Sequence, residues 1–578
     1  MFLKKSKKTY KGKAYETYAL TESYREGGKV KHKHIANLGA LTPEQADKIR
    51  KVLKTVQLED AFVGRLSDVV AKKHYKFLDI AVLDDIWKEL DLDQFFSELP
   101  YVEAMTINRC LDPRTKINIK DWTESTALPR LQGSELPEEY DVYRTLDKIA
   151  DREADLQKHL YWKYTNLGLV AKNTVIYDIT SSYFEGTKCI LASHGYSRDH
   201  RPGRQQVVIA IVITPEGYPL YWQVLPGNTQ DITTVKDLVN VLKRRFGIEK
   251  CLLVFDRGMV SSENLAAVSG QELTYVSALD KDEIRNLEFL DQDSFDFSSE
   301  SWQEELLALG FNAYDKNLYY REYTWNKKRY IIAFSYNLHQ EQKQLRQKHL
   351  QKVKEFLGSC NNELQNAKRS RNREKTEEKI RNYLKKHKMH KIFSWKLEPI
   401  TVKANTSKGQ RMVNSFQIVY SIDEARLKEE SLLDGITCFV TNESPEDLSS
   451  RQVISQYRRK DKIEEAFQEI KSYLQLRPFH LTREKRVKAH VSICVLGYLL
   501  FNSLEQKLKQ AEQSLSAPAA LELLGNCQIN QISPKDSETY VESITELTKE
   551  QAELLKSLNL EHLTWKRSLS KLLEHSTM

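Results

Sequence analysis

Four polar side chains between residues 457 and 471 could do chemistry together if one helix aligned them. In the stretch YRRKDKIEEAFQEIK they are Tyr457, Lys460, Glu464 and Lys471. At about 100° per residue, a helix brings the four within an arc of roughly 60°. Apolar residues such as Ile463 fall on the adjacent arc and would pack that edge into a core. The row predicts either a site made of an acid, two bases and a phenol or a solvated helix face with i,i+4 pairs.

Two aspartates earlier in the chain supply carboxylates that would match Glu464. Asp178 follows the apolar residues 175–177, and Asp256 ends the run CLLVFD. Bare carboxylates a few ångströms apart repel one another, whereas Mg²⁺ prefers oxygen ligands and removes that repulsion. Two metal ions about 3.5–4 Å apart clamp the attacking and leaving oxygens of an in-line phosphoryl transfer. Each aspartate alone could be a turn former or helix cap, so the prediction depends on the three carboxylates meeting.

The elements that would position these carboxylates begin with five strands and two helices. We expect strands at 174–181, 206–214 and 218–227, a helix at 233–246, a strand at 250–258, a helix at 261–270 and a strand at 273–280. This β-β-β-α-β-α-β order is that of the ribonuclease-H-like fold, whose first and fourth strands are neighbours. Asp178 and Asp256 would then lie side by side, and the helix with Glu464 would close the fold against the sheet.

Residues 281–435 intervene before that closing helix, and we interpret them as an insertion. Within them we expect a hairpin at 317–337 and then a long polar helical stretch at 340–390, with 15 Lys and Arg residues against 6 acids. FSWKLEPITVK and VNSFQIVYS then have the pattern of strands. The basic helix could run along duplex DNA or be a solvated charged helix.

The predicted fold class is α/β: a ribonuclease-H-like mixed sheet with an inserted α+β subdomain, preceded by a small β-hairpin and a helical N-terminal module. The expected segments are a hairpin module at 1–45, a helical module at 46–170, the catalytic core at 171–280, the insertion at 281–435, the closing strand and helices of the core at 436–505, and a helical tail at 506–578. The hairpin's basic strand, around Lys31 and Lys33, could touch phosphate or be a solvated face. The tail could pair with another subunit or simply pack.

Bulk composition excludes several other classes of protein. The chain has 578 residues and a formal charge of +8, which permits a nucleic-acid partner without demanding one. Seven cysteines stand singly, with no CxxC pair, which argues against a zinc site or a disulfide framework. No apolar run approaches the roughly 20 residues of a membrane span, and no apolar segment follows the basic start. We therefore expect a soluble, intracellular, multidomain protein with no membrane partner.

The residues described above resemble those of bacterial insertion-sequence transposases of the Asp-Asp-Glu class. The similar branch carries its glutamate in a Tyr-(2)-Arg-(3)-Glu-(6)-Lys signature and has a β-rich insertion in its sheet. The signature maps onto Tyr457, Lys460, Glu464 and Lys471. Lysine replaces the family arginine at position 460, and an ammonium cannot bind a phosphate bidentately as a guanidinium does. The resemblance implies that Tyr457, Lys460 and Lys471 bind the DNA backbone.

The aspartates fit the same resemblance, which covers roughly residues 170–505. YDITS supplies Asp178 and FDRG supplies Asp256, and the stretches HGYSRDHRPGRQQ and VLPGNTQD also match. The resemblance implies that Asp178, Asp256 and Glu464 are catalytic and bind two Mg²⁺ ions, for which Mn²⁺ can substitute.

Further basic residues and tryptophans near the expected site could contact DNA. Arg198, Arg201 and Arg204 lie in a loop just before the second strand, which we expect to be a phosphate clamp, the alternative being a solvated loop. Arg257 follows Asp256 and could bind DNA or pair with a carboxylate. The resemblance also implies that an aromatic residue of the insertion could stack on a flipped base; the alternative for Trp302, Trp325 and Trp395 is a place in the core.

The activity implied is cleavage of DNA at the ends of the protein's own element, followed by joining of the 3′-hydroxyls to target DNA. The implied partners are the terminal inverted repeats, target DNA and a second copy of the chain in a synaptic complex, with end-binding by the 46–170 module, the insertion or both. The expected location is the bacterial cytoplasm, on the nucleoid when DNA is bound. Two alternatives use the same residues: a nuclease or resolvase without strand transfer, and a catalytically inactive DNA-binding protein derived from a transposase.

Overall fold

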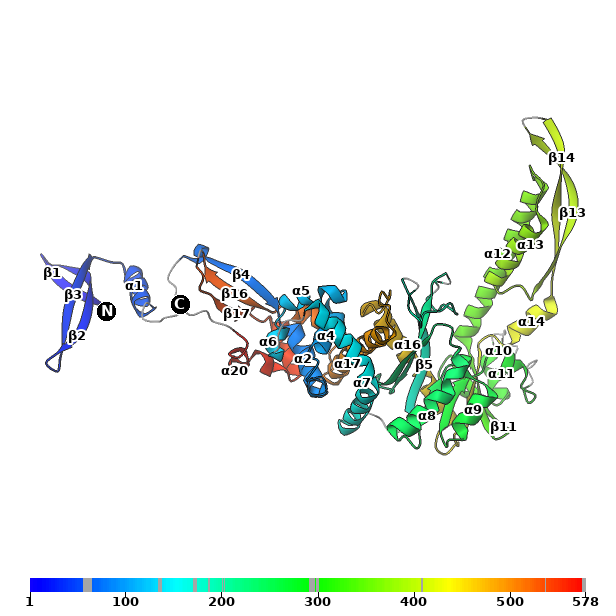
Figure 1. Ribbon diagram of the computed structural model, residues 1–578, viewed down its shortest axis with the longest axis horizontal. Helices are drawn as coiled ribbons and strands as arrows, with labels where there is room; N and C mark the ends of the chain where they lie inside the picture. Colours follow the sequence, from blue (N-terminus) through cyan, green and yellow to red (C-terminus); the bar gives the residue numbers. More distant parts are fainter. Residues whose placement is uncertain are drawn as a thin grey trace. The chain divides into compact units, whose positions relative to one another are not determined.

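The chain forms two compact units in a computed structural model (Figure 1). The first unit comprises Met1–His159, Glu469–Leu476 and Leu481–Met578, and the second comprises Leu160–Gln468 and Arg477–His480. The structure describes residues 1–55, 65–133, 138–169, 174–185, 188–199, 201, 203–290, 297, 301–406, 409–535 and 537–573.

A nine-stranded mixed sheet forms the centre of the second unit. Its order is β10-β11-β12-β15-β9-β8-β5-β6-β7. The strands are β5 (Thr174–Tyr183), β6 (Gln206–Ile213), β7 (Pro219–Pro226), β8 (Leu252–Phe255), β9 (Thr274–Ala278), β10 (Asn312–Ala313), β11 (Leu318–Trp325), β12 (Lys328–Ser335) and β15 (Ile436–Thr441). Every residue of β6 and β8 is buried, which explains why these segments read as continuous apolar runs.

The predicted neighbours of the first strand are confirmed. β5 pairs antiparallel with β6 and parallel with β8, and in the parallel register Tyr177 lies opposite Phe255. The next residues along the two strands are Asp178 and Asp256. The backbone therefore carries both aspartates to one level of the sheet, as the sequence predicted.

Helices pack on this sheet where the sequence placed them. After the sheet's third strand comes α8 (Thr234–Phe246), and α9 (Ser262–Ser269) begins at Ser261, whose hydroxyl accepts from the backbone N–H of Asn264. α15 (Ser450–Arg458) packs against β8 and β9, and α16 (Asp461–Gln468) packs against β5. The expected closing element is thus present, although it is not one helix.

The prediction of a single helix from Tyr457 to Lys471 is wrong. α15 ends at Arg458, and the backbone N–H of Lys460 bonds to the carbonyl of Tyr457, three residues back. Such i→i+3 bonds tighten the last turn of a helix. After α16, residues Glu469–Tyr473 form a π-helical turn, with the N–H of Leu474 bonded to the carbonyl of Glu469. These two irregular turns change the direction of the side chains that a regular helix would have put in one row.

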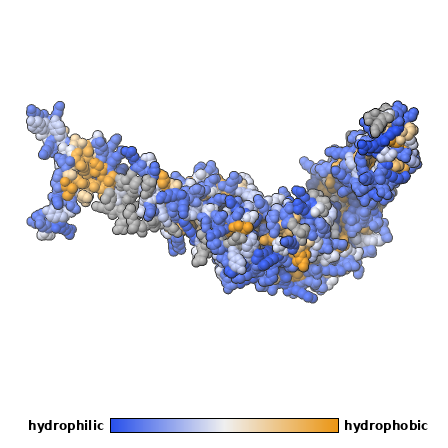
Figure 2. Space-filling view, turned by 45° about the horizontal axis from the view of Figure 1, so that its top comes forward, coloured by the Kyte–Doolittle hydropathy of each residue, from blue (hydrophilic) through white to orange (hydrophobic). Residues whose placement is uncertain are grey.

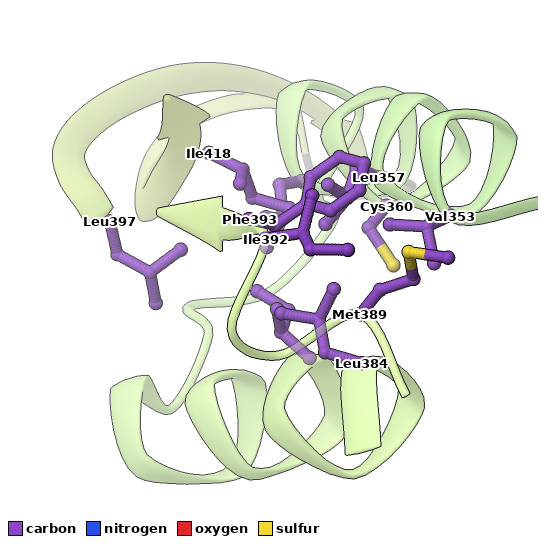
Figure 3. Packing of buried hydrophobic residues seen from close by; sticks show 11 residues of the cluster. Val353, Leu357, Cys360, Leu384, Met389, Ile392, Phe393, Leu397 and Ile418 are labelled. Atoms are coloured by element: carbon purple, nitrogen blue, oxygen red, sulfur yellow. The ribbon is translucent and has the colours of Figure 1, made fainter. Parts of the chain in front are cut away.

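The insertion is also arranged differently from the prediction. Its hairpin, β11–β12, is not part of a separate subdomain, because β12 pairs with β15 and extends the large sheet. The remaining insertion has a core of its own, shown in Figure 3, with Val353 and Leu357 packed near Leu384 and Phe393. The basic stretch at 340–390 is two helices rather than one. The helices and strands of the insertion outside the large sheet are α10 (Lys281–Arg285), α11 (Trp302–Ala308), α12 (Tyr336–Gln365), α13 (Arg373–Lys386), β13 (Phe393–Thr406), β14 (Gly409–Ile422) and α14 (Glu424–Leu432).

The first unit begins with a three-stranded antiparallel sheet. The predicted hairpin corresponds to β2 (Lys13–Glu26) and β3 (Lys29–Gly39), and β1 (Phe2–Tyr10) pairs with β2 as a strand that the prediction missed. α1 (Pro43–Thr55) covers one face, where Leu3, Tyr18 and Ala46 form a small core.

A helical layer follows, as expected from the sequence. Its helices are α2 (Leu78–Glu89), α3 (Leu92–Phe95), α4 (Tyr101–Leu111), α5 (Ile119–Glu124), α6 (Leu128–Gln132), α7 (Glu139–Asn166) and α17 (Glu484–Gln510). In the described part of the chain, α17 is the one helix long and apolar enough to pass as a membrane span, contrary to the sequence expectation. Its apolar window is 94% buried inside the protein, and α17 packs against α2 and α4, so it is the core helix of this unit.

The C-terminal tail is not purely helical as predicted. Besides α18 (Ala517–Leu524), α19 (Lys549–Ser557) and α20 (Lys566–Leu569), it contains β16 (Gln528–Pro534) and β17 (Val541–Ile544). β16 pairs with β17 and with β4 (Val69–Lys76), a strand inside the segment that the sequence assigned to helices. Pairing over more than 400 residues of sequence explains the error for β4, because its partner β16 lies far away in the chain.

Candidate active site

Asp256 and Glu464 are held together by one ammonium group. The Nζ atom of Lys460 lies 3.1 Å from Oδ1 of Asp256 and 2.9 Å from Oε1 of Glu464. The two carboxylate oxygens are therefore at most about 6 Å apart, the sum of these distances. Since Lys460 stands in the turn between α15 and α16, the irregular backbone there places its side chain between the two acids.

Asp178 completes the acidic group from the neighbouring strand. Its Oδ1 accepts a hydrogen bond of 2.8 Å from the backbone N–H of Ile179. Burial raises the pKa of Asp178 to about 7; the Ile179 bond and the charge of Lys460 oppose that rise, while the charge of Asp256 adds to it.

Lys460 and Asp256 shift each other's pKa. Burial would raise the pKa of Asp256, but the charge and hydrogen bond of Lys460, together with the backbone N–H and the charge of Arg257, hold that pKa below its usual range. Burial likewise opposes the charge on Lys460, but its bonds to Glu464 and Asp256 raise the pKa of the ammonium above its usual range. A cation thus occupies the space between two oxygen donors, as a bound metal ion would.

Tyr457 lies beside the same carboxylate. Its hydroxyl donates to Oδ1 of Asp256 over 3.5 Å, and its ring packs against Phe439 of β15 at 5.1 Å between centroids. Burial, and then the charge of Asp256, raises the pKa of Tyr457 to about 12. The phenol therefore stays protonated near neutral pH and can act only as a donor toward Asp256.

Lys471 belongs to a different compact unit from the other three members of the expected row. It lies in the π-helical turn, which belongs to the first unit, and is 9% exposed. Tyr457, Lys460 and Glu464 belong to the second unit. The expectation that Lys471 binds DNA remains a prediction.

The four arginines that the sequence singled out have different surroundings. Arg198 forms an ion pair with Asp231, and its backbone N–H donates to Oγ of Ser181 over 2.9 Å. Arg204 pairs with Glu185 at 2.9 Å. Arg201 lies over the ring of Tyr183 at 5.9 Å, and Arg257 is exposed in the 3₁₀ turn Arg257–Met259. Their DNA contacts remain predictions.

Asp231 is a site residue that the sequence analysis did not single out. A Cβ atom built on Gly258 would lie 3.8 Å from Oδ2 of Asp231 and 4.0 Å from Oδ2 of Asp256. Both carboxylates therefore border the same glycine, and Asp231 carries Arg198 to this region through their ion pair. The stretch VLPGNTQD, which ends in Asp231, is the signal in the sequence that points to this residue.

The loop that carries Arg198 is fixed by close backbone packing. A Cβ atom on Gly195 would lie 2.2 Å from the carbonyl oxygen of Gly227, and one on Gly227 would lie 1.9 Å from that of Gln206. Nε2 of Gln206 donates to the carbonyl of Gly227 over 2.9 Å. Asp199 pairs with Arg477 at 2.5 Å. The glycines of the HGY and LPG stretches thus permit an approach that any side chain would block.

The insertion tryptophans are distributed between core and surface. Trp302 is 8% exposed and stacks on Tyr336 at 4.6 Å, and Trp395 packs against the core of the insertion. Trp325 is 41% exposed at the tip of the β11–β12 hairpin, with Phe289 at 5.8 Å between ring centroids. Of the three, Trp325 alone offers a ring to an incoming base.

The donor set fits a divalent cation, although the side chains are not arranged around one. Among the described residues, no three His, Cys, Asp or Glu side chains are placed to hold a metal ion. Asp178, Asp256 and Glu464 nevertheless offer only oxygen, which Mg²⁺ prefers, and Lys460 already neutralises two of them. A metal at this place would take over the charge balance that Lys460 supplies.

Two protein-family models match the chain. The model described as "IS1634 family transposase, N-terminal domain" matches residues 3–61, and the one described as "Transposase DDE domain" matches residues 171–500, more than half of the chain. A search of the curated proteins found no match.

Two solved structures are also similar to the chain. A cryo-EM structure of a piggyBac transposase synaptic complex with hairpin DNA has 8% identity and a TM-score of 0.35, covering 74% of this chain and 69% of that chain. A Mos1 transposase paired-end complex with a left transposon end has 12% identity and a TM-score of 0.14, covering 41% of this chain and 68% of that chain.

Proposed function

The chain belongs to the family of transposases that carry the DDE domain, and on that premise we propose how its residues perform DNA transposition. Asp178, Asp256 and Glu464 bind two Mg²⁺ ions, for which Mn²⁺ can substitute, on a ribonuclease-H-like sheet. The enzyme cleaves phosphodiesters at the ends of its own element and joins the 3′-hydroxyls to target DNA. When bound, the metal ions would activate the attacking oxygen and stabilise the leaving one.

The observation that carries this proposal is the cation between Asp256 and Glu464. Lys460 lies within 3.1 Å of both carboxylates, and Asp178 stands one residue beyond the Tyr177–Phe255 pair on the adjacent strand. Asp256, at the end of β8, and Glu464, in α16, thus share one ammonium, which balances part of their negative charge. The proposed metal ions would require Asp178 of β5 to join these two acids.

Lys460 exchanges partners when metal and DNA bind. With metal bound by the carboxylates, the Lys460 ammonium would no longer be needed to balance Asp256 and Glu464 and would turn to a phosphate next to the scissile one. One ammonium neutralises a phosphate as a point charge and gives no bidentate geometry. Tyr457, whose hydroxyl is a protonated donor beside Asp256, supplies a second contact to the same backbone.

Other residues are proposed as backbone contacts further from the reacting phosphate. Arg201, Arg204 and Arg257 are exposed or partly exposed around the site, and contacts to phosphate oxygens fix the register of the duplex without reading its sequence. Arg198 would contact a phosphate once DNA displaces Asp231 from its guanidinium group. Lys471 is assigned the same kind of contact, in keeping with the signature.

The assembly that we propose is a homodimer that pairs two element ends. The terminal inverted repeats are bound by the 46–170 module, the insertion or both, and the target duplex is held at the same active sites. The protein works in the bacterial cytoplasm and lies on the nucleoid when bound to DNA.

The test is metal-dependent cleavage by the full-length chain on a duplex that contains an element end. Asp178→Asn, Asp256→Asn and Glu464→Gln should each lower cleavage by more than the roughly 10–100-fold that loss of an outer-shell partner costs. Binding of the end duplex without metal should be retained. Asp237→Asn, which removes an exposed carboxylate from α8, is the matched control and should cleave normally.

Two outcomes would contradict the proposal. Cleavage by any triad variant near the wild-type rate would remove that residue from the site. Efficient cleavage with no joined product, when a target plasmid is present, would show a nuclease without strand transfer.

A further inference from the structure

The sheet formed by β1, β2 and β3 has two faces of different chemistry. Neighbouring residues of a strand point to opposite faces, and residues paired across strands share a face. α1 covers the face that carries Leu3 and Tyr18. We call this the helix-side face and the other the open face.

All the acids of the sheet lie on the helix-side face. In residues 1–39 the acids are Glu16, Glu22 and Glu26. All three lie on β2 an even number of residues from Tyr18, so they share its face of the sheet. Glu16 pairs with Lys5 at 2.7 Å and with Lys7 at 3.2 Å. Glu26 pairs with Lys31. Lys5, Lys7 and Lys31 on this face are therefore paired with acids, whereas Lys29 and Lys33 form no ion pair with another described residue.

The open face carries cations and no acid. Its basic residues are Lys4 and Lys8 on β1 and Lys13 and Arg25 on β2. All four are exposed. None forms an ion pair with another residue in the described part of the chain.

Contacts between aromatic, histidine and serine side chains confirm which residues share the open face. Phe2 and His32 have ring centroids 5.3 Å apart, and Oγ of Ser23 lies 3.0 Å from Nδ1 of His32. Tyr10 and Tyr15, 66% and 51% exposed, stand next to Lys13 and Lys8 in the pairing register. Exposed rings between unpaired cations are the combination found where side chains meet both phosphates and bases.

We infer that the open face of β1–β3 is a docking surface for duplex DNA. This inference rests on the proposed function, because it assigns a DNA contact to a module that the active site does not include. Three strands spaced about 4.8 Å apart span roughly 10 Å, which fits a major groove about 12 Å wide. Lys4 and Lys8 lie roughly 14 Å apart along β1 at about 3.4 Å per residue. The cations can thus reach several phosphates while the rings face the groove, as in other β-sheet readers of DNA.

A second copy of the chain is the rival occupant of this module. Figure 2 shows an apolar patch over the middle of the module formed by β1–β3 and α1, with hydrophilic residues on either side. The exposed apolar side chains of residues 1–55 include Ile35, Leu38 and Val52. The unpaired charge of the open face favours a polyanion, so the experiment must separate DNA binding from self-association.

The experiment compares two double variants that lose the same charge from opposite faces. Lys4→Gln/Lys8→Gln changes the open face, and Lys7→Gln/Lys33→Gln changes the helix-side face; each lowers the net charge by two. Binding of the full-length chain to a fluorescent element-end duplex is measured by anisotropy over a salt series, without metal. The open-face variant should lower the slope of log K against log salt by about 1.8, from about 0.9 per phosphate contact. The helix-side variant should leave the slope unchanged.

Equal slopes for the two variants would overturn the inference, as would a change in molecular mass by light scattering for the open-face variant alone. A circular-dichroism spectrum equal to that of the wild type shows that a weakened variant is folded. The Asp178→Asn variant should bind the duplex with the wild-type salt slope. That result would separate the test of the open face from the test of the active site. Failure of metal-dependent cleavage would contradict the proposed catalysis and leave the two-variant comparison intact.

Discussion

At the scale of single residues, the site depends on one cation shared by two acids. Lys460 bonds to Asp256 and Glu464, and it takes the place of an arginine in the family signature. The lysine can balance charge in the absence of metal and can then release the carboxylates. In this proposal Lys460 balances the carboxylates without metal and contacts phosphate with metal, and the alanine and arginine variants test whether its charge is needed.

We predict that Lys460→Ala slows cleavage by about 10–100-fold, the usual cost of losing an outer-shell partner. Lys460→Arg should keep most of the activity, because a guanidinium still pairs with carboxylate and phosphate. The measurement is the single-turnover cleavage rate over a Mg²⁺ series. Equal rates for the alanine and arginine variants would show that the charge at this position is not used.

The raised pKa of Asp178 predicts how the metal-free protein responds to pH. In the folded protein this pKa is about 7, whereas an aspartate in an unfolded chain titrates near about 3.9. The folded state therefore holds an extra proton between these values, and this contribution to stability is lost as pH rises through about 7. With a chelator present, the Tm of the wild type should fall more between pH 5 and 8 than that of Asp178→Asn. Parallel Tm curves would contradict the assignment.

Asp231 is predicted to position Arg198 rather than to react. Asp231→Asn removes the ion pair and should raise KM for the end duplex, with a loss of kcat/KM within about 10–100-fold. Arg198→Lys in the same background should add little further loss, because the two residues act as a pair. A loss as large as that of the triad variants would instead make Asp231 a metal ligand.

At the scale of elements, the loop before β6 is held by backbone approach rather than by side chains. Gly195 and Gly227 lie so close to neighbouring carbonyls that neither tolerates a Cβ atom. The loop ends at the strand whose neighbour carries Asp178. Its rigidity therefore fixes where Arg198 stands relative to the acids.

We predict that Gly227→Ala destabilises the protein by at least about 1–3 kcal/mol, the range for overpacking a tight site. A Cβ atom there would meet the carbonyl of Gln206 at 1.9 Å. Gly203→Ala is the control, since no atom lies within 4 Å of its Cβ position. Thermal unfolding compares the two variants. An unchanged Tm for Gly227→Ala would mean that the loop does not pack as described.

At the scale of the whole molecule, the chain forms two units that each have their own core. α17 provides the centre of the first unit, and the nine-stranded sheet provides the centre of the second. The chain passes between the units several times, so the polar signature from Tyr457 to Lys471 is divided between them. Chains with several domains commonly unfold in more than one step.

We therefore predict that core truncations act within one unit. Leu499→Ala in α17 and Leu220→Ala in β7 remove fully buried side chains and should each cost about 2–5 kcal/mol. Hydrogen exchange should show reduced protection in the unit that carries the substitution and wild-type protection in the other. Loss of protection throughout the chain for both variants would show one cooperative unit.

The sequence by itself determined the strand order of the core, because burial on both faces makes β6 and β8 continuous apolar runs, and it singled out Asp178, Asp256 and Glu464 as candidate acids. A carboxylate next to buried apolar residues, as Asp178 is within β5 and Asp256 is after β8, stands out without any structure. The tertiary structure alone decided that the signature is split by a tight turn and a π-helical turn. It also decided that β4 pairs with β16, that the insertion's hairpin joins the sheet, and that Asp231 borders the site. Each of these depends on contacts between distant segments, which local periodicity does not encode.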